Sequence, residues 1–102
     1  MKPGYRIECV PNISSAEPNL LALISEAIEQ TPEVRLHFVD PGRAAIRTVF
    51  TYVGPAHRVF EATHKLFDLS LAHIDMLTHA GVHPRMGAWD VCPFVLLDYR
   101  AH

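Results

Sequence analysis

Four side chains of this sequence have the types that could bind and transform a polar substrate. His83 and Arg85 lie in the segment GVHPRMGAWDVCPF at positions 81–94, Asp40 opens the turn DPG, and Arg47 follows that turn. A histidine can accept and return a proton near neutral pH, because its unperturbed pKa is about 6.5. An aspartate can orient an imidazole or meet a cation, and an arginine can hold a carboxylate through two parallel hydrogen bonds. These residue types favour acid–base chemistry on an anionic substrate.

Each of these residues also has an ordinary structural interpretation. A His-Pro pair at the entrance of a strand, as at His83, is commonly a turn. Asp40 can stabilise its own loop, and Arg47 inside a strand can be solvated or can pair with Glu8 across a sheet. Residue types alone leave both interpretations open.

The seven histidines of the chain raise the question of a metal site. His79 and His83 are four residues apart, the spacing that places two ligands on one face of a helix. Gly81 lies between them and is a typical helix stop, and no cysteine or carboxylate completes a familiar ligand spacing. We therefore expect no metal.

The composition limits what kind of body carries these residues. A chain of 102 residues suits one domain, here 1–102. Nine Lys and Arg against eleven Asp and Glu leave it slightly acidic, without the basic stripe that binds nucleic acid. The longest apolar run, VCPFVLL, is too short to span a membrane, and the N-terminal residues do not form a secretory signal. We expect a cytoplasmic protein with no membrane and no nucleic-acid partner, in which Cys9 and Cys92 are buried thiols.

Glycines and prolines divide the chain into six segments with alternating periodicity. Period-two alternation predicts strands, and in the second of them Val34, Leu36 and Phe38 share one face. Apolar residues three and four positions apart predict two helices, the second with Val59, Phe60 and Leu71 among its apolar positions. The expected elements are a strand at 5–10, a helix at 18–30, strands at 34–40 and 46–53 that form a hairpin, a helix from 55 to the stop at 81, and a strand at 90–97.

This β-α-β-β-α-β order is that of the ferredoxin-like fold. The predicted class is α+β, with a four-stranded antiparallel sheet that carries two helices on one face. The other face would expose Val39, Val49 or Phe50, and Val53, a mixture too apolar for water. We therefore expect a homodimer, or a complementary chain, packed against the open sheet face.

Several blocks of the sequence are similar to one enzyme family in order and spacing. They are ECVPN at 8–12, DPGRAAIRTVFTYVG at 40–54, IDM at 74–76 and HPRMGAWDVCPF at 83–94. Together they resemble the N-terminal subdomain of glutamate formimidoyltransferase, the folate enzyme of histidine breakdown. The resemblance implies transfer of a formimidoyl group from N-formimidoylglutamate to tetrahydrofolate as co-substrate. It also implies that His83 is the catalytic base.

The chain departs from this family at positions that affect the prediction. Members use two facing subdomains, of which this sequence resembles only the first, so we expect activity to need a second subdomain or chain. Polar positions of the family hold Ser15 and Ala16, Val82 and Ile46 here, which removes hydrogen bonds that a polar substrate would use. Two alternatives to an active transferase therefore stay open. One is a non-catalytic relative that binds a folate or another small anion, and the other is a self-associating interaction module.

Overall fold

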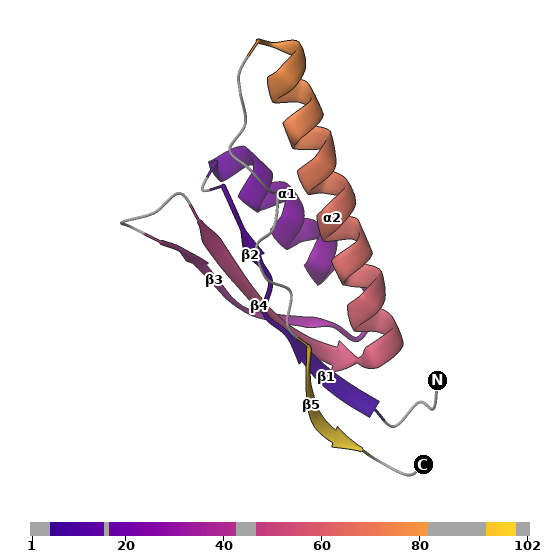
Figure 1. The fold of residues 1–102 in the computed structure, drawn as a ribbon. Coiled ribbons are helices and arrows are strands. Elements are labelled where there is room, and N and C mark those ends of the chain that lie inside the picture. Colours follow the sequence, from indigo (N-terminus) through magenta and orange to yellow (C-terminus); the bar gives the residue numbers. More distant parts are fainter. Residues whose placement is uncertain (1–4, 16, 43–46, 82–93, 100–102) are drawn as a thin grey trace.

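The computed structural model describes residues 5–15, 17–42, 47–81 and 94–99 of the chain. Within these residues seven elements follow one another (Figure 1). They are β1 (Tyr5–Cys9), β2 (Asn12–Ile13), α1 (Pro18–Glu29), β3 (Arg35–Pro41), β4 (Thr48–Pro55), α2 (Ala56–His79) and β5 (Phe94–Tyr99).

β1 and β2 are two parts of one strand of the expected fold. Both pair antiparallel with β4, and Asn12 lies opposite Val49 in the register that β1 sets. β1 ends before Pro11, as predicted, but the sequence analysis did not predict that pairing with β4 resumes at β2. Pro11 has no N–H to donate, but its carbonyl accepts a hydrogen bond from the Phe50 N–H at 3.1 Å. The chain therefore stays against β4 across the break and resumes pairing.

The sheet is antiparallel throughout, with β4 between β3 on one side and β1 with β2 on the other. β5 pairs with the other side of β1. When β1 and β2 are counted as one strand, this is the predicted ferredoxin-like arrangement, including the hairpin of β3 and β4. The α+β prediction is confirmed.

Both helices pack on one face of this sheet (Figure 1). The inward-facing side chains of β1 and β4 alternate with outward ones, as a period of two requires. The inward-facing side chains pack against one apolar face of each helix and form a single core with it. Its members are Ile7, Cys9, Ile13, Leu20, Ile24, Ile28, Phe50, Tyr52, Ala56, Val59, Ala62 and Leu66. Neither helix of the described residues is long and apolar enough to cross a membrane.

The buried face of α2 differs from the one that its large apolar residues indicate. Phe60 and Leu71 are 45% and 52% exposed, whereas Ala62, Thr63 and Ser70 are buried. Small side chains on the inner face let a helix approach a sheet closely, so the larger ones are displaced to its flanks. Phe60 and Leu71, although part of the apolar period that predicted this helix, therefore lie outside its buried face.

A β-bulge in β3 reverses the orientation of the residues that follow it. The register on β4 shifts between Leu36 and Phe38, so His37 is an extra residue. Leu36 and Val39 therefore pack against the core on the helix side, while Phe38 turns to the open face and is 67% exposed. The predictions that Phe38 shares a face with Leu36 and that Val39 lies on the open face are wrong.

A buried polar contact joins β4 to α2. The Tyr52 hydroxyl lies 2.6 Å from Thr63 Oγ1, and Thr63 donates to the Val59 carbonyl at 2.8 Å. Since Thr63 has one hydroxyl proton, Tyr52 is the donor to Thr63. Cys9 Sγ lies 3.7 Å from the same oxygen. The Cys9 side chain is buried, as predicted, and Cys92 lies outside the described residues.

Candidate functional site

Asp40 lies near the end of β3 on the sheet face without helices. It is exposed and stands directly opposite Val49 of β4. Val49 alternates with the inward-facing Phe50, so both Asp40 and Val49 point to the open face. The bulge at His37 is what sets this orientation, because without an extra residue Leu36 and Asp40 would share a face.

Arg47 lies immediately before β4, on the same open face as Asp40. Its carbonyl accepts a hydrogen bond from the Gly42 N–H at 2.8 Å, which extends the pairing of the two strands by one step. Arg47 is exposed and lies two residues before Val49, the position opposite Asp40. Such diagonal neighbours on one sheet face are about 7–8 Å apart. The hairpin therefore brings the two predicted site residues together.

The strand register excludes the alternative in which Arg47 pairs with Glu8. Glu8 stands opposite Val53 of β4, six residues beyond Arg47. At about 3.3 Å per residue the two positions are about 20 Å apart along the strand. Glu8 instead shares a row across the open face with Val53 and Arg35. Val53 of β4 stands between them, opposite Glu8 of β1 on one side and Arg35 of β3 on the other.

Asn12 is a candidate that the sequence analysis missed. It stands opposite Val49 from the β2 side, as Asp40 does from the β3 side. The three residues thus form one row across the open face, with a half-buried amide at one end and a carboxylate at the other. The signal was present in the block ECVPN: continuing the alternation of Arg6 and Glu8 past the proline places Asn12 outward.

The loop after β2 reaches the same end of the sheet. Thr48, the first residue of β4, donates its hydroxyl proton to the Ser15 carbonyl at 2.7 Å. The Ser15 hydroxyl in turn accepts from the Glu17 N–H at 3.1 Å. Ser15 occupies one of the positions where the sequence departs from the family pattern, and its polar groups are used to hold the loop and the start of α1.

His83 and Arg85, together with Val82, lie outside the described residues, as do Ala16 and Ile46. The described chain leads up to them through α2, which ends at His79. Gly81 follows with φ 79°, a left-handed conformation that glycine adopts without strain. The predicted helix stop at Gly81 is confirmed. The candidate site residues that the structure describes are Asp40, Arg47 and Asn12.

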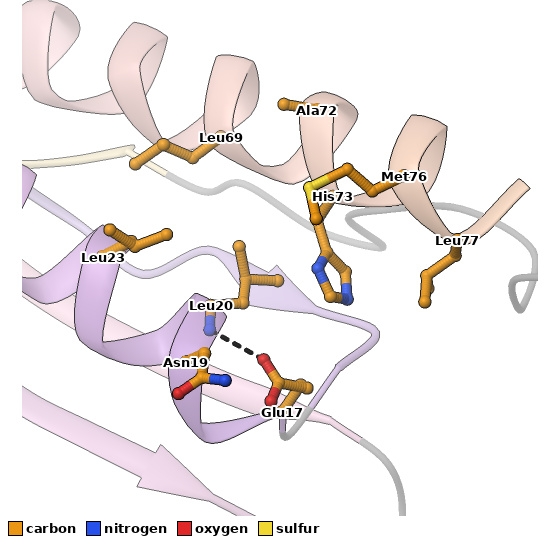
Figure 2. Close-up of a pocket in the computed structure, with 9 residues that line it drawn as sticks. All are labelled: Glu17, Asn19, Leu20, Leu23, Leu69, Ala72, His73, Met76 and Leu77. Atoms are coloured by element: carbon orange, nitrogen blue, oxygen red, sulfur yellow. Dashed lines mark hydrogen bonds between the residues drawn. The ribbon is translucent and has the colours of Figure 1, made fainter. Parts of the chain in front are cut away.

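One groove of the described residues lies elsewhere, on the helix side (Figure 2). It has a volume of about 410 Å³ and runs between the beginning of α1 and the second half of α2. Leu20, Leu23 and Met76 line it, and the Glu17 carboxylate beside it accepts from the Leu20 N–H at 2.9 Å as the cap of α1. Neither Asp40 nor Arg47 lines this groove.

The described residues contain no group of three or more His, Cys, Asp or Glu side chains that could hold a metal ion. The two histidine–aspartate contacts of α2 each join one pair on its exposed surface: His64 with Asp68, and His79 with Asp75. Such exposed pairs one helical turn apart contribute little to stability.

Comparison with known proteins gives consistent matches over nearly the whole chain. Residues 6–101 match the family model described as formiminotransferase domain, N-terminal subdomain. The chain is 46% identical over 90 residues to a formimidoyltransferase-cyclodeaminase from Rattus norvegicus and 44% identical over 90 residues to one from Gallus gallus. Each alignment covers 87% of this chain and 17% of the relative.

A shorter relative matches over the same extent. The chain is 40% identical over 91 residues to a glutamate formimidoyltransferase from Streptococcus pyogenes serotype M1, which covers 87% of this chain and 30% of that protein. The chain therefore spans less than a third of the length of these relatives.

Proposed function

The chain belongs to the family of the formiminotransferase N-terminal subdomain, and on this basis we propose that it takes part in formimidoyl transfer. In this proposal the donor is N-formimidoylglutamate and the acceptor is tetrahydrofolate, bound as co-substrate. The observation that carries it is the placement of Asp40 and Arg47 as diagonal neighbours at one end of the open sheet face.

The reaction needs one proton acceptor and one proton donor. N5 of the folate attacks the amidine carbon, a new C–N bond forms, and the bond from that carbon to the glutamate nitrogen breaks. A base must take the N5 proton, and the leaving nitrogen must receive one. We assign the transfer of this proton to His83. A single imidazole can perform both steps near neutral pH.

The remaining residues would bind rather than react. Asp40 would meet the cationic amidine or orient the imidazole. Arg47 and Arg85 would each hold a carboxylate of the glutamate or folate moiety through paired hydrogen bonds. We add Asn12 as a donor or acceptor in the row of Asp40, since its half-buried amide faces the same side.

We propose that the open face packs against a complementary subdomain, supplied by another chain or by a second copy. A site on one face of a single sheet is open to water, and catalysis of this kind benefits from a dry, closed environment. Phe38 and Val49 on that face would contribute apolar contact. A cytoplasmic location is part of the proposal.

One observation supports a second candidate, a relative that binds the ligand without turnover. The hydroxyl and carbonyl of Ser15, at a position that is polar in the family pattern, are engaged by Glu17 and Thr48. They hold the loop instead of facing a ligand. A site that keeps Asp40 and Arg47 but lacks other polar groups would bind an anion more readily than it would catalyse.

Calorimetric titration tests ligand binding and separates the two candidates from a simple interaction module. Tetrahydrofolate and N-formimidoylglutamate are titrated separately into the wild type, the Arg47→Gln variant and a matched control. We expect Arg47→Gln to weaken binding of at least one ligand by tenfold or more, because a charge-assisted hydrogen bond contributes about 1.5–3 kcal/mol. Arg35→Gln is the control, since Arg35 is exposed on the same face at the far end of the hairpin.

The outcomes distinguish the candidates. Binding with turnover only after addition of a C-terminal subdomain supports the transferase, and binding without turnover supports the second candidate. If neither ligand binds with or without that subdomain, both candidates are wrong.

A further inference from the structure

Phe38 is a large apolar side chain on the sheet face without helices. The bulge at His37 turns it away from the core, and both helices pack on the other face (Figure 1). Its neighbour across the hairpin is Thr51 of β4, a much smaller side chain, and Phe38 stays 67% exposed. A single exposed apolar residue is common on protein surfaces, so its neighbours decide what it can contact.

The ring of His37 stands perpendicular to the ring of Phe38. Their centroids are 6.3 Å apart and their planes meet at 81°. Such an edge-to-face contact occupies at most one face of the Phe38 ring. Since the side chain is mostly exposed, a flat aromatic face remains available to a ligand.

Three side chains of the β3–β4 hairpin follow one another along the open face. Asp40 stands opposite Val49 and Phe38 stands opposite Thr51, so the carboxylate and the ring lie two residues apart on β3, about 7 Å. Arg47 lies on the other side of Asp40, two residues before Val49. The order along the face is therefore guanidinium, carboxylate, aromatic ring.

The two co-substrates of the proposed transfer present complementary groups in the same order. N-formimidoylglutamate carries carboxylates at one end and a cationic amidine at the other. The amidine carbon must meet N5 of tetrahydrofolate, and N5 belongs to the pterin, whose conjugated pyrimidine half is flat. With a carboxylate at Arg47 and the amidine at Asp40, the pterin lies over Phe38. N-formimidoylglutamate contains no ring, so of the two co-substrates only the folate can use a flat aromatic face.

From this order we propose that Phe38 binds the pterin of tetrahydrofolate by ring stacking and thereby positions N5 beside the amidine at Asp40. The inference rests on the proposed function and adds to it a residue that distinguishes the two co-substrates. Stacking of flat conjugated rings is favourable beyond the apolar area that it buries. Phe38 takes no proton and forms no bond in this role. It holds the pyrimidine half of the pterin, so that the reduced half with N5 is directed towards Asp40.

Calorimetric titration of two Phe38 variants tests this role. The ligands are tetrahydrofolate, a tetrahydropterin without the aminobenzoylglutamate tail, and N-formimidoylglutamate, each titrated with and without the C-terminal subdomain. We expect Phe38→Ala to weaken binding of both pterin ligands about tenfold, the scale for loss of an aromatic stacking partner. Binding of N-formimidoylglutamate should be unchanged. Phe38→Tyr keeps the flat ring and should bind all three ligands as the wild type does.

Two further variants separate this role from a general effect on the face. Arg47→Gln should give the opposite pattern, with weaker binding of N-formimidoylglutamate and unchanged binding of the tailless tetrahydropterin. Phe60→Ala is the matched control, because Phe60 is an exposed phenylalanine of α2 on the helix side. It should leave the affinity for all three ligands unchanged.

Three results would overturn the role of Phe38 and leave the proposed function standing. They are unchanged tetrahydrofolate binding in Phe38→Ala, equal weakening of all three ligands as expected from a lost subdomain contact, and weakening of tetrahydrofolate without weakening of the tailless tetrahydropterin. The last result would place the aminobenzoyl ring on Phe38 instead of the pterin. If no ligand binds with or without the C-terminal subdomain, the proposed function itself is wrong, and the inference fails with it.

Discussion

Gly54 lies where the turn between α1 and β3 passes closest to β4. A Cβ atom at this position would be 2.9 Å from the Glu33 carbonyl oxygen and 3.2 Å from Val34 Cα. Both are backbone atoms, so the clash can be relieved only by a shift of the turn or the strand. We expect Gly54→Ala to lower the free energy of unfolding by about 1–3 kcal/mol, measured by urea denaturation.

Gly81 is the comparison for Gly54, because at Gly81 a glycine is favoured by the backbone conformation and not by a close contact. Its φ is 79°, and among the described residues, chain neighbours aside, no atom lies within 4 Å of a Cβ built there, so a side chain meets strain but no clash with them. Gly81→Asn should be nearly neutral, since asparagine tolerates the left-handed region. Equal stability of Gly54→Ala and the wild type would show that the close approach at β4 does not exist.

The His83 prediction concerns a single side chain and its chemistry. We expect His83→Ala to keep the melting temperature within a few degrees, because a histidine on a loop contributes little to folding. In a preparation made active by a complementary subdomain, the rate should fall about 100-fold or more, the usual effect of removing a general base. An unchanged rate, or a variant that does not fold, would contradict the assignment of His83 as the base.

At the scale of elements, β4 and α2 are joined by the hydrogen bond between Tyr52 and Thr63. Tyr52→Phe removes the donor and leaves the ring in place, so we expect a loss of about 1 kcal/mol of stability. A double-mutant cycle with Thr63→Val measures the coupling of the two hydroxyls. The double variant should be more stable than the sum of the two single losses predicts. Purely additive losses would mean that the 2.6 Å contact contributes no coupling.

Sequence periodicity predicted the order, type and approximate bounds of the elements, because alternation and helical spacing are local properties. It failed where one strand depends on another. The break at Pro11 and the extra residue at His37 are defined by hydrogen bonds to β4, and no local pattern specifies that register. Residue types suggested Asp40 and Arg47 as candidates, whereas Asn12 became a candidate only through the row that it shares with Asp40.

At the scale of the whole molecule, the open face should contact the complementary subdomain. Val49 lies half-buried in the row of Asn12 and Asp40. Val49→Lys should weaken binding of a separately produced C-terminal subdomain at least tenfold, since burying an unpaired ammonium is costly. Light scattering of mixtures measures this, with Leu23→Lys on the helix side as control. Equal weakening by both variants would show that the open face is not the specific contact.

The bulge in β3 makes the position of Asp40 depend on the number of residues in the strand as well as on their identity. Because His37 is an extra residue, the alternation of inward and outward side chains along β3 is reversed after it. Adding or removing one residue between the bulge and Asp40 would turn the carboxylate towards the core, although every chemical group of the site would still be encoded. A relative with all of these residues but a β3 of different length would therefore have a different binding surface.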